Sequence, residues 1–339
     1  MKPRWTRRIL ALALLGVAAT IEVGAAAQQA QATTPGKNGK IAFRRFFDQE
    51  RTWGAVFVAN ADGTGARQVT HPAHGVLDDQ PDWSPNGSLL VFTRCAISVP
   101  CAIYTVKPDG TSVKRLSTPV RDDQSDDSGV SFTPDGRHVV FTRASGGVRT
   151  YPGGEQVKHS DLVVMDLKGK HRRVLIRAGL YRADYEFAMF SPDGSQFVYG
   201  YRKSFFADPH SPRALFVASA DGKHRRQITP WAMNAGENPD WSPDGSRILF
   251  YSNDDEDMRT QSQLYTIRAD GTDLKQLTQF PDGTITGSSS FSPDAAEIVF
   301  GKADAGGMAD VFVMHADGSD IRPVTRSAQW DAAPDWGSS

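Results

Sequence analysis

The stretch that decides the fold reads Asn238-Pro239-Asp240-Trp241-Ser242-Pro243-Asp244-Gly245-Ser246-Arg247-Ile248-Leu249-Phe250. It predicts a short strand that ends in an aromatic residue, a tight turn, and a second strand that returns antiparallel to the first. Pro243 presets its own φ angle, Asp244 tolerates the next turn position, and Gly245 closes the turn. The stretch therefore has the pattern of a β-hairpin.

Variants of this hairpin recur along the chain. The turn is repeated at residues 84–87, 133–136, 191–194, 242–245 and 292–295, with spacings of 49, 58, 51 and 50 residues. Near the N-terminus, Asn38-Gly39 is a further copy that lacks its opening strand. Near the C-terminus, Pro334-Asp335-Trp336 is an opening strand with no turn after it. We expect the two ends of the chain to complete one unit together.

Each unit contains three further predicted strands after the opening one. The first ends aliphatic-aliphatic-aromatic, as in residues 248–250, the second leads into a glycine turn, as in residues 264–271, and the third is basic or polar, as in residues 275–278. No window shows sustained helical periodicity with caps. Six units of four strands predict an all-β fold, a six-bladed β-propeller of four-stranded antiparallel blades closed by N- and C-terminal strands that share one blade. The alternative is an open solenoid, which would leave unpaired edges and need capping repeats.

The first 32 residues predict a secretory signal peptide. Four basic residues lie within residues 2–8, an apolar run covers residues 9–21, and Ala30-Gln31-Ala32 has the form of an A-x-A cleavage site. The apolar run is shorter than the roughly 20 residues that a membrane-spanning helix needs. We therefore expect export to the periplasm or the outside of the cell, with residues 33–339 forming a single propeller domain without a membrane span.

Charge and cysteine content narrow the partners and the compartment. The 38 Lys and Arg do not outnumber the 39 Asp and Glu, and no basic stripe is present, so nucleic-acid binding is not expected. The only two cysteines are Cys95 and Cys101. In an oxidising compartment, a disulfide between them is favoured over two free thiols. We expect the exported protein to be a monomer.

The repeat resembles the WD-like repeat of TolB-type propellers. The resemblance is carried by Pro239-Asp240-Trp241-Ser242-Pro243-Asp244-Gly245, by the aliphatic-aliphatic-aromatic strand that follows, and by endings such as Gln227-Ile228-Thr229, and it covers residues 36–337. It implies a secreted or periplasmic six-bladed propeller. TolB itself is a periplasmic, non-catalytic component of the Tol-Pal envelope system that binds partner proteins. We expect this chain to depart from TolB in lacking its N-terminal α/β domain, which argues against a true TolB role. The repeat also occurs in prolyl-oligopeptidase-type peptidases and oligogalacturonate lyases, so it does not select one function.

Propeller geometry predicts where a binding site lies. The tight turns fall on one face, so the blade-to-blade connections and the second-to-third loops fall on the other, which we call the loop face. Loops on a rigid scaffold are the usual carriers of binding. The irregular stretches are residues 46–53, 94–101, 145–159, 203–213, 253–263 and 303–309. Tyr151, Phe205 and Phe206 are candidate partner contacts there, or else rings that pack over a blade edge.

Polar residues precede the innermost strands and are expected to ring the channel mouth on the same face. The candidates for partner binding are Asp79, Asp127, Glu186, Glu237, Asn238 and Asp331. One hypothesis is an acidic funnel that attracts a basic peptide or a divalent cation such as calcium. The other is that these carboxylates bond to backbone amides or to neighbouring arginines.

Catalysis and cofactors find little support in the sequence. There is no Gly-x-Ser-x-Gly nucleophile motif, no phosphate-binding glycine loop and no set of histidines with metal-ligand spacing. We therefore expect no cofactor beyond a possible divalent cation, and no catalytic or metal-ligating residue is assigned. The function predicted is a non-enzymatic propeller that binds a protein or peptide. The alternative is a carbohydrate-active lyase or a sugar-binding propeller that uses the channel mouth.

Overall fold

The structure is a computed structural model that describes residues 35–97, 99–119, 125–150, 156–177, 184–202, 211–235, 238–253 and 261–339. Within these residues the protein is all-β, with 24 strands in five sheets and one short 3₁₀ turn, η2 (Trp231–Met233). The predicted signal peptide, residues 1–32, lies outside the described residues. No helix among the described residues is long and apolar enough to cross a membrane.

Four of the sheets are four-stranded, and all their strand pairs are antiparallel. The first contains β8 (Asp126–Phe132), β9 (His138–Thr150), β10 (Gln156–Asp166) and β11 (Arg173–Ile176). The second contains β12 (Asp184–Phe190), β13 (Gln196–Arg202), β14 (Arg213–Ser219) and β15 (Arg226–Gln227). The third contains β16 (Asp240–Trp241), β17 (Arg247–Asn253), β18 (Ser262–Arg268) and β19 (Lys275–Gln276). The fourth contains β20 (Ile285–Phe291), β21 (Glu297–Ala303), β22 (Ala309–His315) and β23 (Arg322–Pro323).

The other eight strands form one larger sheet in the order β24-β1-β2-β4-β5-β6-β7, with β3 also paired to β2. Its members are β1 (Asn38–Phe46), β2 (Gly54–Ala59), β3 (Arg67–Gln68), β4 (Val76–Trp83), β5 (Leu90–Ala96), β6 (Val99–Val106), β7 (Lys114–Arg115) and β24 (Asp331–Ser338). The prediction of six separate four-stranded antiparallel blades is therefore wrong, since the described residues form only four such blades. The sheet is continuous because Gly54 of β2 pairs in parallel with Leu77 of β4. Gly54 has no side chain, and an added Cβ would lie 2.7 Å from the Arg45 carbonyl oxygen of β1 and 3.0 Å from the Leu77 side chain of β4, so glycine fits between these two strands.

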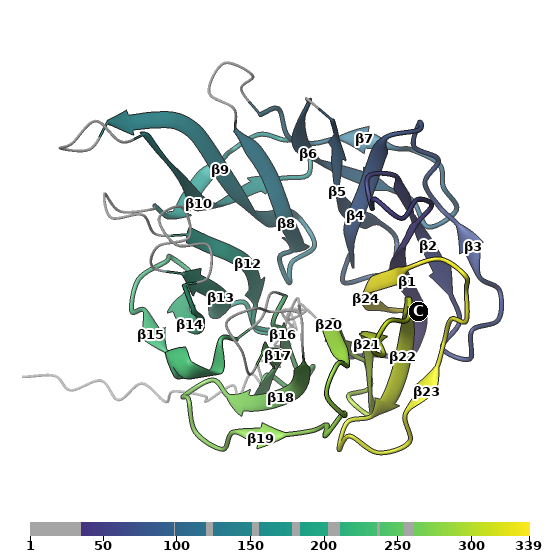
Figure 1. Ribbon diagram of the computed structural model, residues 1–339. Coiled ribbons are helices and arrows are strands. Elements are labelled where there is room, and N and C mark those ends of the chain that lie inside the picture. Colours follow the sequence, from purple (N-terminus) through teal and green to yellow (C-terminus); the bar gives the residue numbers. More distant parts are fainter. Residues whose placement is uncertain are drawn as a thin grey trace, which may run out of the picture.

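The sheets are arranged radially around a common centre, with β4, β8, β12, β16, β20 and β24 nearest to it (Figure 1). The first and last strands of the chain pair antiparallel, with Arg45 opposite Asp331 and Ile41 opposite Trp336. The predicted pairing of the two chain ends is confirmed. The radial repetition leaves short strands, such as β15, β19 and β23, at the outer edges of the sheets, which limits their pairing with another molecule.

The repeated hairpin turns have the structure that their residue types predict. In the turn after β16, Ser242 Oγ donates to the Asp244 carboxylate at 2.6 Å, and the Gly245 amide donates to the Ser242 carbonyl at 2.8 Å. Gly245 has a φ of 70°, a conformation that glycine adopts without steric cost. These turns therefore form from local chemistry alone.

The aromatic residue that ends each opening strand belongs to the core between sheets. Trp241 is fully buried and packs in one cluster with Val198, Leu215 and Val217 of the preceding sheet. Its indole Nε1 donates to the carbonyl of Met189 at 3.0 Å. Trp241 therefore packs between two sheets, and the repeated motif serves to join neighbouring sheets.

The basic outer strands also join neighbouring units. In three places a long basic side chain donates to a backbone carbonyl two residues before the turn glycine of the following unit. The basic side chain there takes the place of water as the hydrogen-bond donor to that carbonyl. The contacts are Arg67 Nη2 to Pro108 O at 2.5 Å, Lys114 Nζ to Leu167 O at 3.0 Å and Arg226 Nη2 to Ala269 O at 2.7 Å.

Candidate functional site

A small open cavity of about 50 Å³ lies where the innermost strands meet. Six short segments line it: residues 80–82 of β4, 129–131 of β8, 187–189 of β12, 238–240 at the start of β16, 288–290 of β20 and 333–335 of β24. A second cavity of about 20 Å³ continues from it toward the tight-turn face. Both are smaller than a typical small-molecule pocket, and it is the convergence of six strands on one opening that makes this place the candidate for a binding site.

A bulge in five of the six innermost strands, β4, β8, β12, β20 and β24, shapes the lining. In β4 the pairing with β5 shifts register between Asp79 and Asp82, and Gln80 has a left-handed φ of 51°. Phe187 and Asn238 occupy the corresponding positions with φ angles of 50° and 53°. Bulges of this kind bend a strand and redirect its side chains. The lining residues are therefore held by backbone geometry that the sheets impose.

Three carboxylates line the cavity, those of Asp82, Asp240 and Asp335. Each accepts a hydrogen bond from a backbone amide of another unit, and these amides belong to residues 132, 291 and 83 at 2.8, 2.8 and 2.7 Å. Burial, followed by the charges of Asp335 and Asp240, raises the pKa of Asp82 well above its usual value. Burial also raises the pKa of Asp335. The repeated Pro-Asp-Trp motif thus supplies both the interlocking of units and the charge of the cavity.

The carboxylates predicted at the channel mouth are paired with arginines. Asp127 is buried, and both its oxygens accept from Arg143 at 2.6 and 2.8 Å. Asp331 is likewise buried and bound by Arg45 through two hydrogen bonds of 2.7 Å. In both cases the two residues are opposite one another in register on adjacent strands. Two parallel hydrogen bonds between guanidinium and carboxylate are a strong and geometrically specific contact.

The other predicted mouth residues differ in their surroundings. Asp79 is paired with Arg44, and Glu186 is paired with the buried Arg213 at 2.7 Å. Asn238 lines the cavity and donates from its side chain to Ser288 Oγ at 2.7 Å. Four predicted contacts, at Glu237, Tyr151, Phe205 and Phe206, lie outside the described residues. Partner binding by any member of this set stays a prediction.

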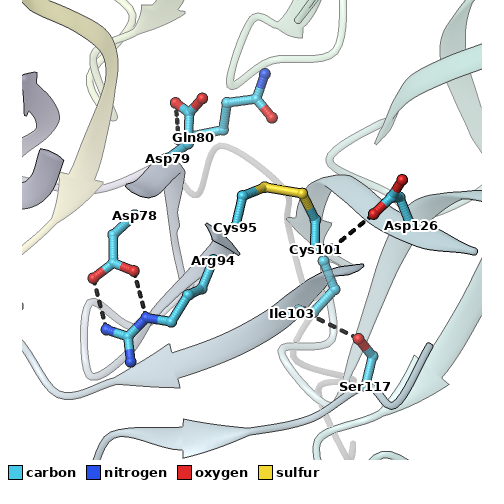
Figure 2. The surroundings of a disulfide bond; sticks show 9 residues. All are labelled: Asp78, Asp79, Gln80, Arg94, Cys95, Cys101, Ile103, Ser117 and Asp126. Carbon is cyan, nitrogen blue, oxygen red and sulfur yellow. Dashed lines mark hydrogen bonds and ion pairs between the residues drawn. A yellow bond between two sulfur atoms is a disulfide. The ribbon is translucent and has the colours of Figure 1, made fainter. Parts of the chain in front are cut away.

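The predicted disulfide is present between Cys95 and Cys101, with an S–S distance of 2.01 Å. It links β5 and β6 near the loop at which this hairpin turns, and Figure 2 shows it beside Asp126 and the Asp78–Arg94 pair. The backbone amide of Cys101 donates to the Asp126 side chain of β8 at 2.8 Å. The disulfide closes the β5–β6 loop of the eight-stranded sheet, and the hydrogen bond to Asp126 holds this loop against the neighbouring blade.

The Asp78–Arg94 pair in Figure 2 is a further example of the buried carboxylate and arginine arrangement, with distances of 2.5 and 2.7 Å. The guanidinium also lies 4.9 Å from the ring centre of Tyr104. Burial opposes the charged form of Arg94, but the hydrogen bond and charge of Asp78 leave its pKa raised. Such pairing compensates the negative charge that the sequence places at the mouth.

The described residues offer no ready metal centre, since no group of three or more His, Cys, Asp and Glu among them is placed to hold a metal ion. The lining of the larger cavity, as far as it is described, includes the three aspartates and contains no His, Lys or Arg. Binding of a divalent cation such as calcium stays a prediction.

The alternative of neighbouring arginines as partners of the mouth carboxylates is confirmed, whereas sequence reasoning missed the aspartates of the cavity and did not name the individual arginines. The aspartate of Pro-Asp-Trp was treated as part of strand construction, although an acidic residue in an otherwise apolar strand is a signal in its own right. The arginines also left a signal. Arg45, Arg94 and Arg143 all stand two residues after the aromatic that ends the second strand of their unit.

These radial sheets around a central cavity define the class as a β-propeller. Residues 236–339 match the sequence profile of the TolB beta propeller domain. The fold is similar to that of TolB from Acinetobacter baumannii, at 18% identity and a TM-score of 0.63 over 89% of this chain and 67% of that chain. It is also similar to a putative TolB from Agrobacterium tumefaciens, at 19% identity and a TM-score of 0.56 over 87% and 91% of the two chains. The predicted resemblance to TolB-type propellers is therefore confirmed by the profile match over residues 236–339 and by the similarity of the fold.

A curated relative matches a shorter part of the chain. Dipeptidyl-peptidase 5 of Porphyromonas endodontalis is 34% identical over 110 residues, which are 32% of this chain and 15% of that protein. The match therefore covers a small part of the relative's length. Together with the family match, it is consistent with propeller repeats that occur in proteins of different function.

Proposed function

We propose that this protein is a non-enzymatic binding scaffold that receives a protein or peptide segment at the cavity mouth on the loop face. The observation that supports the proposal most is the cavity itself, which opens among the six innermost strands and is lined by residues held at bulges. A rigid, preformed opening of this kind lowers the entropy lost when a flexible segment binds. The TolB-type repeat supports a scaffold role by resemblance.

We also propose that the protein is exported and that its first 32 residues are removed. The leader pattern in those residues and the disulfide between Cys95 and Cys101 support this proposal, because disulfides persist in oxidising compartments. The mass and N-terminal sequence of the protein recovered from the periplasm or the medium test it. A mature chain that begins at Thr33 is expected, and a chain that retains its leader in the cytoplasm would refute export.

Site-specific cross-linking tests the binding face. A photoreactive phenylalanine derivative replaces Gln80 at the cavity, and a matched variant carries it in place of Arg137, which is exposed in the tight turn before β9. Irradiation in cells is expected to give a defined higher-mass adduct from position 80 and none from position 137. Thermal unfolding shows that both variants are folded. Equal adducts from both positions, or none from position 80, would contradict binding at the cavity.

A further inference from the structure

The loop between β1 and β2 is ordered by its own hydrogen bonds. The Asp48 carboxylate accepts the backbone amides of Thr52 and Trp53 at 3.0 and 3.1 Å and the Thr52 hydroxyl at 2.6 Å. Side-chain acceptors of this type fix short loops by replacing missing backbone contacts. Arg51 lies inside this loop with a left-handed φ of 58°. The loop therefore fixes the backbone conformation of Arg51 before any ligand binds.

The guanidinium of Arg51 lies over the ring of Trp330, with 3.6 Å between its central carbon and the ring centre. Trp330 directly precedes β24, and its carbonyl accepts the Phe46 amide at 3.0 Å, which anchors this residue to β1. Stacking uses the flat face of a guanidinium, whereas its five N–H donors lie in the plane of the group. The stack therefore fixes the cation and leaves its donor edge available.

Arg51 differs from the arginines of the channel mouth in its counter-charge. Arg45 is bound by two oxygens of Asp331, whereas no carboxylate within the described ranges forms an ion pair with Arg51. Glu50, next to it in sequence, is exposed. Burial, and then the like charge of Arg44, lower the pKa of Arg51, so the two cations are close neighbours. Within the described ranges, Asp79 is the one carboxylate that forms an ion pair with either Arg44 or Arg51, and its partner is Arg44.

The position of this cation relates it to the cavity. Trp330 directly precedes Asp331, the first residue of the innermost strand β24. Asp79 is the partner of Arg44, and the next residue, Gln80, lines the cavity. The Arg51–Trp330 stack thus lies on the loop face beside two of the strands that enclose the opening.

We propose that the donor edge of Arg51 is a binding site for a carboxylate on the segment that the cavity receives, with Trp330 as its fixed support. This inference rests on the proposed function and reverses the charge preference expected from the sequence, because the mouth carboxylates are compensated by arginines. A planar fork of N–H donors matches a carboxylate through two parallel hydrogen bonds. The recognised segment is therefore acidic at the residue that meets Arg51.

Binding of a defined acidic peptide tests the site. The probe is N-acetyl tetra-aspartate amide, the neutral reference is N-acetyl tetra-asparagine amide, and binding is followed by isothermal titration at low salt. Wild type is expected to bind the acidic peptide about tenfold more tightly than the neutral one. Arg51→Gln removes this preference, Arg51→Lys keeps only part of it because a point charge lacks the planar fork, and added salt weakens it. The control Arg137→Gln removes the same charge from the other face and leaves the preference unchanged.

The other outcomes overturn the proposal. No preference in wild type, or an unchanged preference in Arg51→Gln with wild-type thermal stability, shows that Arg51 binds no carboxylate. Tight binding of inorganic phosphate that depends on Arg51, without binding of the acidic peptide, assigns the site to a free phosphate ion instead. A cross-link from position 80 that survives in Arg51→Gln leaves the proposed function standing while this inference fails.

Discussion

The glycine turns that contact a neighbouring sheet provide a sharp test of how the units are held together. Gly222, in the turn between β14 and β15, has a φ of 80°, and a Cβ added there would lie 2.0 Å from the carbonyl oxygen of Leu175 in β11 of the preceding sheet. Gly222→Ala therefore adds two penalties, a strained backbone and a collision with backbone atoms. The collision cannot be relieved by rotating a side chain, so one sheet must move relative to the other.

The size of each penalty can be estimated separately. A left-handed conformation costs an alanine about 1–2 kcal/mol, and insertion of an atom into a packed contact costs about 1–3 kcal/mol. Gly222→Ala is thus expected to lower the free energy of unfolding by about 2–5 kcal/mol. Gly75 has a φ of 74° but nothing within 4 Å of an added Cβ, so Gly75→Ala carries only the strain of about 1–2 kcal/mol. Gly287 has neither feature, and Gly287→Ala is expected to change stability by less than about 0.5 kcal/mol.

Urea unfolding of the three variants, followed by tryptophan fluorescence, measures these differences. The slope of free energy against urea must be the same for all three if they unfold in the same way. The difference between Gly222→Ala and Gly75→Ala isolates the contact between sheets. A loss in Gly222→Ala no greater than that in Gly75→Ala would refute the argument that this turn is packed against Leu175.

Three further outcomes are expected. Asp82→Asn should raise the free energy of unfolding at pH 7 by about 1 kcal/mol and flatten its pH dependence. The pKa of Asp82 is raised in the folded state, so wild type loses stability as the pH rises from the unfolded pKa of 3.8 through the raised folded pKa. Parallel profiles of stability against pH for the two proteins would contradict this. Asp127→Ala should lower the free energy of unfolding by about 3 kcal/mol, because it removes the counter-charge of the mostly buried Arg143. Lys223→Gln breaks an exposed pair and should lower it by less than about 0.5 kcal/mol. Equal losses in the two variants would show that burial of the pair does not matter. Cys95→Ser should lower stability by about 2 kcal/mol, and reduction by dithiothreitol should lower the unfolding midpoint of wild type but not of the variant.

The turns and the strand sequence were predictable because they depend on neighbours in the chain. The hydroxyl of Ser242 binds a carboxylate two residues away, and Pro, Asp and Gly prefer these turn positions whatever surrounds them. The disulfide was predictable for the same reason, since its cysteines are six residues apart. The pairing of the chain ends followed from counting the strands of the repeat.

The candidate site could be predicted only in its location. Residues that precede the innermost strands do lie around the mouth, but the pairing of Asp331 with Arg45 spans 286 positions of the chain. Nothing local in the sequence indicates that one residue neutralises the other. The sequence offered both an acidic funnel and pairing with neighbouring arginines, and only strand register decides for the pairing and identifies each partner.

The sequence by itself determined an all-β protein of TolB-type repeats with tight turns on one face and a local disulfide, because turn chemistry and strand periodicity act over a few residues. Only the tertiary structure decided that β2 joins β4 in one eight-stranded sheet, that Asp82, Asp240 and Asp335 meet in a cavity, and that Arg51 lies on Trp330. These features arise where distant segments come into contact. Their outcome depends on register and on small differences in side-chain volume, such as the missing Cβ at Gly54, that a repeated pattern does not encode.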